Sequence, residues 1–509
     1  MVAQELISQG INLPLPLAVL LVGGIASPLV GLLAERVGLR RLREVWMIFV
    51  SGAALVSVYI LYRGLLTPAG DVAVRVVAIW GQLPPLGGCF EIDALSVFMT
   101  GSIAFLGFLV SVYSYIYMER EGRLTEFYTL VTFMMAGMTG IAMAGDFFTL
   151  FIFWELMGLS SYVLVAFLKS RWGPIEAGLK YLLMSATASA FMLLSMSFLY
   201  GMTGTLNFAL LAASLRGAAP TPWIFALFSS LIIGFGVKSA IVPLHTWLPD
   251  AHPEAPSPIS ALLSGIVIET GLYGLTRVLY LIFDPSFFRI PIAALAVLTM
   301  TLANITALLQ QDIKRLLAYS SIAQIGYMLI GLASGTAYGV AGLFLHVFNH
   351  SLMKGMAFLS AGSIVHEVDT RDIGSLKGVG RMMPFTSMSL FIAFLGLGGV
   401  PGTNGFISKF ILFSSAIGAG MVWLAVAGVL NSALSMAYYL RVFKTLVSSP
   451  EDATFEAKEV HPFMVGVTVV MATLIIILGV YPSPLINFAS RASEALVTNI
   501  EQYILAVAS

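Results

Sequence analysis

The chain has 509 residues, of which 58% are hydrophobic and 10% are charged, and its formal net charge is zero. Soluble domains carry about a quarter charged residues, so this composition predicts an integral membrane protein. The neutral balance provides no basic surface for nucleic acid, and the single cysteine, Cys89, cannot by itself ligate an iron–sulfur cluster or form an internal disulfide.

Apolar segments that suit a bilayer recur about fourteen times, since a spanning helix needs roughly 20 apolar residues. In chain order the predicted spans are 14–34, 44–63, 93–118, 127–145, 147–168, 176–201, 223–248, 257–281, 288–310, 313–335, 338–366, 384–416, 420–446 and 462–488. The expected fold is an all-α polytopic membrane protein. The first segment lacks the basic flank and cleavage site of a signal peptide, so we interpret it as a span.

Basic residues predict the orientation of these spans. Loops after the odd-numbered spans contain sixteen of them: Arg36, Arg40, Arg41, Arg43, Arg120, Arg123, Lys169, Arg171, Lys314, Arg315, Arg371, Lys377, Arg381, Arg441, Lys444 and Lys458. Loops after the even-numbered spans contain four: Arg63, Arg75, Arg216 and Arg289. By the positive-inside rule, the loops after the odd-numbered spans lie on the cytoplasmic side of a cell membrane, and both termini lie on the outer side.

Several titratable residues remain inside the predicted spans: Glu155, Lys180, Lys238, Glu269, His346, His350, Lys354 and Lys409. Arg277 lies close to the end of its span, from where its side chain could reach the interface. A charge at the centre of a membrane-spanning helix costs about 2.5–3.5 kcal/mol. A single such residue could be explained as one member of a structural ion pair. Eight of them, of both signs and on different helices, favour a proton path.

Three of these residues share one helix face, because His346, His350 and Lys354 follow one another at intervals of four residues. The spacing suits a ladder for proton hops, since imidazole titrates near neutrality. Alternatively, these three side chains could form only structural hydrogen bonds to neighbouring helices, with no role in proton transfer. A zinc site is a third hypothesis, but the pattern lacks the glutamate of His-Glu-x-x-His and an obvious third ligand.

Two predicted spans contain helix-breaking residues. Pro243 follows Lys238 in the seventh span, and "GLGGVPGTNGF" precedes Lys409 in the twelfth. Paired interrupted helices are typical of transport sites, and their separation by five spans predicts two inverted halves. The expected units are 1–118, the repeats 127–281 and 288–446, and a C-terminal helix and tail over 462–509. Ordinary proline kinks are the alternative.

The segment "PLHTWLPDAHPEAPSP" contains His245, Asp250, His252 and Glu254 and no lysine or arginine. It could collect protons at a channel mouth, or it could be a rigid proline-rich turn.

Long motifs resemble the antiporter-like subunits of respiratory complex I, of Mrp-type sodium/proton antiporters and of complex I-related membrane-bound hydrogenases. They are "FWELMGLSSY", "KSAIVPLHTWLPDAHPEAPSPISALLSG", "GLYGLTR", "QQDIKRLLAYSSIAQIGYM", "FNHSLMKGMAFLSAGSIVH" and "GTNGFISKF". The resemblance covers spans three to thirteen. It implies a fourteen-helix core with two inverted five-helix repeats. Because the chain stops soon after the last span, it resembles the shorter type without a C-terminal lateral helix.

The resemblance also implies roles for individual residues. Glu155 and Lys238 correspond to the pair whose charge state gates translocation in this family. His350 and Lys354 correspond to its central polar axis, and Lys409 to the ionisable residue of its broken twelfth helix. Glu269 departs from the pattern, because many members have a lysine there; it could relay a proton or hold a sodium ion.

The function expected from these features is ion translocation by a subunit that has no redox cofactor or metal and lies among other membrane subunits. Neighbours would drive it by electrostatic coupling along the charged axis. A stand-alone Mrp-type antiporter subunit is the first alternative. A catalytic subunit that binds quinone or a cluster is the second, and a purely structural membrane anchor is the third.

Overall fold

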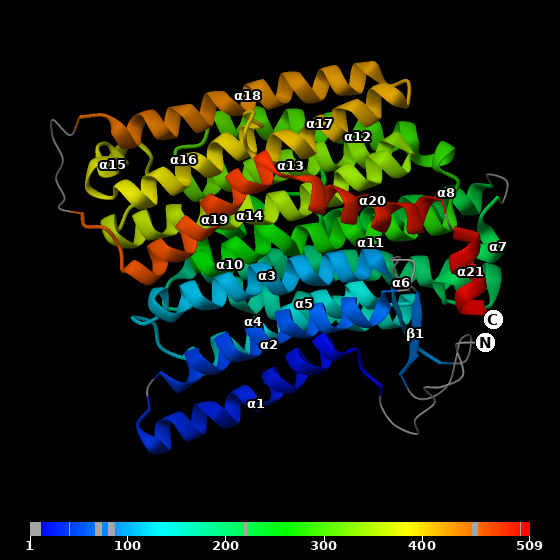
Figure 1. The fold of residues 1–509 in the computed structure, drawn as a ribbon, viewed down its shortest axis with the longest axis horizontal. Coiled ribbons are helices and arrows are strands. Elements are labelled where there is room, and N and C mark those ends of the chain that lie inside the picture. Colours follow the sequence, from blue (N-terminus) through cyan, green and yellow to red (C-terminus); the bar gives the residue numbers. More distant parts are fainter. Residues whose placement is uncertain are drawn as a thin grey trace.

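The computed structural model describes residues 12–39, 41–66, 74–79, 87–217, 221–449, 457–498 and 500–508. Arg40, one of the basic residues used for the orientation, lies outside these ranges. Most of the long helices run side by side, with α1 at one edge of the bundle and α18 at the opposite edge (Figure 1). The short helices α7 and α21 lie together at one end of the bundle.

In the first half of the chain the elements are α1 (Leu15–Val37), α2 (Leu42–Leu65), β1 (Arg75–Ala78), β2 (Cys89–Ile92), α3 (Ala94–Tyr117), α4 (Leu124–Met143), α5 (Phe147–Val165), α6 (Trp172–Thr203), α7 (Phe208–Leu215), α8 (Pro222–Lys238), α9 (Leu248–Glu254), α10 (Ser257–Leu262), the π-helix η1 (Leu263–Val267) and α11 (Ile268–Ile282). In the second half they are α12 (Pro285–Leu308), α13 (Ile313–Ser334), α14 (Ala337–Val368), the 3₁₀ helix η2 (Gly374–Leu376), α15 (Val379–Met382), α16 (Pro384–Gly398), α17 (Asn404–Gly418), α18 (Val422–Val447), α19 (Pro462–Val480), α20 (Ser483–Val497) and α21 (Ile500–Ala508).

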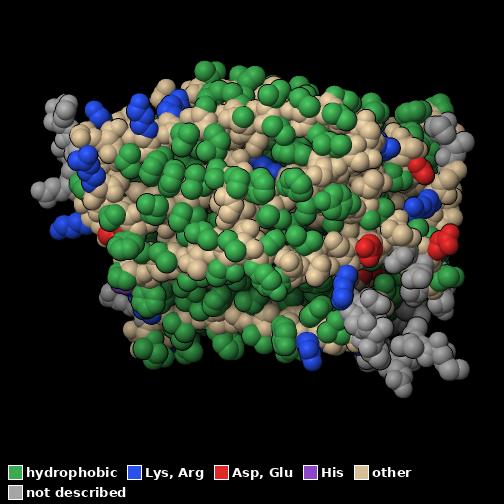
Figure 2. Space-filling model, turned by 45° about the horizontal axis from the view of Figure 1, so that its top comes forward, with side chains coloured by type: hydrophobic (Ala, Val, Ile, Leu, Met, Phe, Trp, Pro, Cys, Tyr) green, Lys and Arg blue, Asp and Glu red, His purple; other side chains and the backbone are tan. Residues whose placement is uncertain are grey.

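The helices have the composition of membrane spans. Within the described ranges 11 are long and apolar enough to cross a membrane, and a twelfth is added if the bent pair Gly374–Met382 and Pro384–Gly398 forms one span. Figure 2 shows hydrophobic side chains over most of the middle of the visible face, with most charged side chains toward its two ends. The all-α polytopic fold is confirmed, whereas the inverted repeats remain a prediction.

The predicted spans match the helices closely except at the two breaks and near the C-terminus. The helix expected over 223–248 ends at Lys238, and the span expected over 384–416 is divided into α16 and α17. The span expected over 462–488 ends at Val480, because Tyr481 leaves the helical conformation and Pro482 follows it. A separate helix, α20, then packs against α14 and α3. The antiparallel ribbon of β1 and β2 and the short helices α7 and α21 were not predicted.

A buried polar cluster joins the C-terminal helix α21 to α11. Arg277 on α11 is buried rather than directed to the interface, and it contacts Asp93 at 3.1 and 3.3 Å. Its Nη2 lies 3.9 Å from Glu91, which accepts hydrogen bonds from Asn207 at 3.1 Å and from Tyr503 on α21. Burial raises the pKa of Glu91 to about 8, against an opposing effect of Arg277.

The docking of α21 should depend on pH through Glu91. The Glu91 carboxyl has a pKa of about 8 when α21 is docked and about 4.5 when the carboxyl is exposed. Between these two pH values the docked state binds a proton that the undocked state has lost. The contribution of Glu91 to docking is therefore largest below the lower value, falls by up to about tenfold per pH unit above it, and is lost as pH passes about 8. Labelling of the sole cysteine, the adjacent buried Cys89, by a thiol reagent reports this opening.

Glu91→Gln is the control, because the amide keeps an uncharged partner for Tyr503 at every pH. Labelling of this variant therefore reports only how the reactivity of the Cys89 thiol itself changes with pH. Wild-type labelling should rise with pH more steeply than labelling of this variant. Identical pH profiles for the two proteins would contradict a protonated Glu91 in the docked state.

Candidate functional site

The helix break predicted after Lys238 is present. Helix α8 ends at this lysine, and the chain turns through Ala240, whose φ of +52° no helix accommodates. The Val242–Pro243 peptide that follows is cis. Trp247 Nε1 donates to the carbonyl of Val237 at 2.7 Å, a carbonyl that also accepts from the backbone N–H of Ala240 at 3.1 Å, so the indole fixes the α9 segment to the end of α8.

Glu155 and Lys238 meet at one pocket of about 50 Å³ between α5, α6 and α8. The ammonium of Lys238 is buried, donates to the Tyr181 hydroxyl at 3.2 Å and lies over the Tyr181 ring at 4.9 Å. Glu155 is half-buried and accepts a hydrogen bond from Ser189. The carboxylate and the ammonium share the pocket without an ion pair within 4.0 Å.

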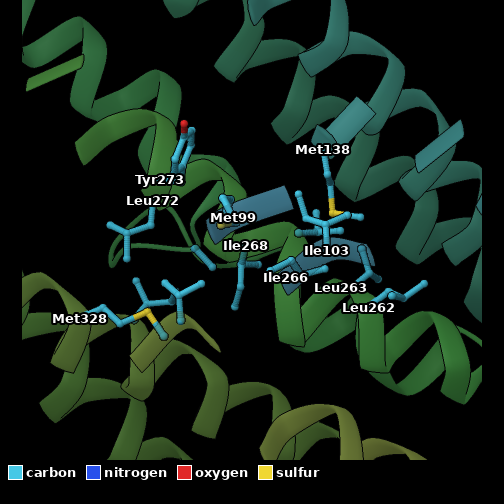
Figure 3. Close-up of a cluster of buried hydrophobic side chains, with 14 of the residues drawn as sticks. Met99, Ile103, Met138, Leu262, Leu263, Ile266, Ile268, Leu272, Tyr273 and Met328 are labelled. Carbon is cyan, nitrogen blue, oxygen red and sulfur yellow. The ribbon is translucent and has the colours of Figure 1, made fainter. Parts of the chain in front are cut away.

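Glu269 lies two residues beyond the end of the π-helix η1, inside a continuous helical stretch formed by α10, η1 and α11. Figure 3 shows the apolar packing here, where Leu263, Ile266 and Ile268 belong to one cluster of buried side chains that includes Met99, Met138 and Met328. Glu269 is fully buried, and its Oε1 lies 2.5 Å from Nδ1 of His350. Neither Glu269 Oε2 nor His350 Nε2 has a hydrogen-bond partner.

The face of α14 carries the predicted ladder, but its members bond to different helices. The rings of His346 and His350 are 6.1 Å apart, and no hydrogen bond links them. His346 bonds Ser408 at 2.8 Å and Gln324 at 3.0 Å. Lys354 donates to the carbonyl of Leu317 at 2.8 Å and to Ser320 at 2.6 Å. The direct hydrogen bonds of this face therefore lead into neighbouring helices rather than along α14.

The second predicted break separates α16 from α17. Gly399 and Gly402 have φ values of +80° and +89°, which glycine adopts without strain. Lys409 on α17 folds back to this break and donates to the carbonyl of Leu397 at 2.6 Å and to Ser432 at 2.9 Å. Its ammonium lies 4.4 Å from the centre of the Tyr327 ring.

Lys180 does not belong to the buried set. Its side chain is 49% exposed and pairs with Glu176 at 2.9 Å and with Asp250 at 3.1 Å. The residue faces outward near the start of α6 and lies apart from the buried axis, so its place within the membrane stays a prediction.

The acidic residues of the α9 segment form salt bridges with basic residues from other parts of the chain. Asp250 also contacts Arg315 at 3.4 Å, and Glu254 contacts Arg371 at 3.1 Å. His252 is fully buried, stacks on Phe358 at 4.6 Å and has no hydrogen-bond partner on either ring nitrogen. The segment is thus a fixed turn, and its proton-collecting role remains a hypothesis.

Several residues that contact the titratable groups of the axis were not identified from the sequence. Their spacing of three or four residues nevertheless indicates that they share one helix face. On α6, Tyr181, Ser185 and Ser189 recur every four residues and line the Glu155 pocket or bond its groups. On α13, Ser320, Gln324 and Tyr327 likewise follow one face. Among the described residues, no group of three or more His, Cys, Asp or Glu side chains could hold a metal ion.

The fold and this buried axis define a polytopic membrane protein of the ion-transporter class. The family described as "NADH:quinone oxidoreductase/Mrp antiporter, TM" matches residues 144–435, and "NADH-Ubiquinone oxidoreductase (complex I), chain 5 N-terminus" matches residues 86–128. The chain belongs to this family of antiporter-like membrane subunits.

Named relatives agree with this assignment. F(420)H(2) dehydrogenase subunit N of Methanosarcina mazei is 35% identical over 80% of this chain and 85% of the relative. NADH-quinone oxidoreductase subunit N of Trichlorobacter lovleyi is 35% identical over 86% of this chain and 91% of the relative.

Solved structures agree as well. A chain of the archaeal membrane-bound sulfane sulfur reductase has a TM-score of 0.89 and 29% identity, covering 97% of this chain and 99% of its own. A chain of respiratory complex I from Thermus thermophilus has a TM-score of 0.76 and 26% identity, covering 93% of this chain and 99% of its own. A chain of the Mrp complex from Dietzia, at 22% identity and a TM-score of 0.88, covering 98% of this chain and 100% of its own, shares the fold.

The contact between Glu269 and His350 predicts a stability difference between two variants. Glu269→Ala leaves the buried Nδ1 of His350 without its partner, which costs about 1–3 kcal/mol. Glu269→Gln retains a side-chain oxygen or amide at the same place. Thermal unfolding of the detergent-solubilised proteins should therefore rank wild type above Gln, and Gln above Ala. Equal melting temperatures for the two variants would contradict a supporting role for this bond.

Proposed function

We propose that this chain translocates protons, or exchanges protons for sodium ions, as a membrane subunit of a redox-driven multi-subunit complex. One observation carries the proposal. Six of the seven titratable groups on the axis are fully or almost fully buried, and together with the half-buried Glu155 they extend from α5 to α17. Ionisable residues inside membrane spans are costly and rare, and they typically mark ion pathways and proton relays.

In this proposal Glu155 is the gating acid. Its charge stabilises the ammonium form of Lys238 across the shared pocket, because opposite charges in a poorly solvated site favour each other's ionised state. Loss of that charge allows Lys238 to release its proton toward Glu269. Gly271 supports this step, since a side chain there would collide with Ser239 and separate α11 from the α8 break.

Glu269 and His350 form the central relay of the proposal. The carboxyl and the imidazole share one short contact, and each has a second polar atom without a partner. One proton can therefore reside on either group, and the free atoms can exchange it with water. His346, Lys354 and Lys409 continue the axis beyond this dyad.

The relatives support a redox-linked setting. Their names, F(420)H(2) dehydrogenase subunit N and NADH-quinone oxidoreductase subunit N, describe subunits of oxidoreductases. We propose that this chain lies beside other membrane subunits in a cell membrane. The excess of basic residues in the odd-numbered loops supports the proposal that both termini lie outside. We propose that the chain carries no redox cofactor itself. The identity of co-purifying subunits tests this placement, because an assembly without a redox module would favour an Mrp-type antiporter.

Glu155→Gln should abolish ion translocation while the complex still assembles. The amide keeps the hydrogen bond to Ser189 but removes the charge that acts on Lys238. Ion flux is measured in vesicles containing the purified complex, and assembly is measured from its subunit composition. Glu176→Gln, at an exposed acid of α6, is the matched control and should retain full flux. Normal flux in Glu155→Gln would rule out the gating role.

Variants of Glu269 test the central relay. Glu269→Gln cannot carry a proton and should lower flux by at least about tenfold, as the loss of a positioned proton-transfer group does. Glu269→Lys restores a titratable group and should retain more flux than Gln. Both are measured with sodium present and with sodium replaced by choline, which separates proton flux from exchange. If neither variant changes flux or ion preference, Glu269 is only a structural partner.

A further inference from the structure

The outward-facing side chains of α19 and α20 differ in kind. Helix α20 follows α19 along the bundle (Figure 1). The large exposed hydrophobic side chains of α19 are Phe463, Val469, Val470, Ile476, Ile477 and Val480, which suit lipid tails. The exposed side chains of α20 are Ser483, Pro484, Asn487, Arg491 and Glu494, and four of these five are polar. The outer surface of α20 therefore lacks the apolar cover that a lipid-facing helix needs.

The backbone between the two helices also leaves polar groups on this surface. In a helix each carbonyl oxygen accepts from the N–H four residues further along the chain. For Leu478 and Val480 these residues are Pro482 and Pro484, and proline has no N–H. Val480 is 73% exposed and Tyr481 is 64% exposed, so the break lies at the surface of the bundle. Carbonyl oxygens at this place need a hydrogen-bond donor that lipid tails do not provide.

Contacts place the α19–α20 break at the depth of the buried axis. A Cβ at Gly479 would lie 2.4 Å from the carbonyl oxygen of Gly402, so α19 ends directly against the α16–α17 break. Beside that break Asn404 and Asn349 share hydrogen bonds of 2.9 and 3.1 Å, and Asn349 immediately precedes His350 on α14. Helix α14 continues about 18 Å from Asn349 in one direction and about 28 Å in the other. This depth therefore lies inside a hydrocarbon layer about 30 Å thick.

The first turns of α20 lie at a similar depth. Phe488 packs edge-on against Phe98 of α3, with ring centres 5.5 Å apart, and the ring of Phe98 in turn contacts that of Phe348 on α14 at 6.4 Å. Asn487 directly precedes Phe488, and Ser483 lies one turn closer to the break. The hydroxyl and the amide are therefore level with the apolar core of the bundle rather than with the water outside it.

We propose that Tyr481, Ser483 and Asn487, which together are called the polar break face, form the docking surface for a transmembrane helix of a neighbouring membrane subunit. This inference rests on the proposed place of the chain among other membrane subunits and assigns one contact surface to that place. Protein has to cover the polar break face, because irregular backbone that faces lipid does not occur within the hydrocarbon layer.

The polar break face also indicates the chemistry of its partner. Ser483 and Asn487 provide a hydroxyl and an amide, so the facing helix carries hydrogen-bonding side chains such as serine, threonine or asparagine. Ser483 and the exposed Gly402 are small, which allows the two backbones to approach closely. Toward the C-terminal end of α20, Arg491 and Glu494 continue the same face, so the partner has an acid and a base at that level.

Site-specific photocrosslinking of the intact complex in its native membrane tests the docking. A diazirine amino acid at position 487 should form a covalent product with another membrane subunit of the purified complex, which mass spectrometry identifies. The matched control is the same amino acid at position 470, because Val470 is 48% exposed on the apolar face of α19 and should give lipid adducts only. Lipid adducts alone at position 487, or a product that joins two copies of this chain, would overturn the docking.

Substitution of Asn487 provides an independent measurement. Asn487→Leu suits lipid but removes the amide, so retention of the crosslinked subunit during detergent purification should fall at least about threefold, as expected for one interhelical hydrogen bond in a membrane. Asn487→Ser keeps a hydrogen-bonding group and should retain more of this subunit. Thermal unfolding of both variants checks that the chain itself remains folded. Equal retention of the subunit in the two variants and the wild type would contradict the docking.

The two levels of the inference fail separately. If other membrane subunits co-purify with the wild-type chain while position 487 reacts only with lipid, the docking surface fails and the proposed function stands. If the wild-type chain purifies without any other membrane subunit, the proposed place in a complex and the docking surface fail together.

Discussion

The three buried lysines of the axis are held by neutral oxygen atoms. Lys238 donates to a tyrosine hydroxyl, and Lys354 and Lys409 each donate to one carbonyl and one serine. Within the described part of the chain, none of the three has a carboxylate within 4.0 Å. A lysine bound in this way can lose its proton without leaving a buried anion unpaired, which would cost several kcal/mol.

The helix breaks contribute to this arrangement at Lys238 and Lys409, whereas Lys354 donates to a carbonyl inside the unbroken helix α13. An uninterrupted helix uses its carbonyls internally, whereas the last turn of a helix leaves them free. The end of α16 provides the Leu397 carbonyl for Lys409, and the end of α8 places Lys238 itself at the break. In a bilayer such free groups need a protein partner, so the lysines and the breaks stabilise each other. The axis is therefore built into the backbone path as well as into the side chains.

Much of this could be predicted from hydropathy and from glycine and proline positions. The bundle, the break after Lys238 and the break before Lys409 follow from local sequence. The contact of Glu269 with His350 joins residues 81 apart, and no local pattern specifies it. The tyrosines of α18 are a similar case: two adjacent apolar rings suit a core equally well, and only the packing of three helices brings their hydroxyls to Asn304 and Ser320.

The π-helix before Glu269 has a consequence for comparing this helix with its relatives. A π turn holds one more residue than an α turn, and each residue of an α-helix turns the following face by about 100°. Two related chains that differ in this turn would need a one-residue gap between Leu263 and Val267 to align in space. An ungapped alignment would pair Glu269 with a residue on another face of the helix. Whether an acid or a base occupies the place beside His350 in a relative is thus a question for superposed structures.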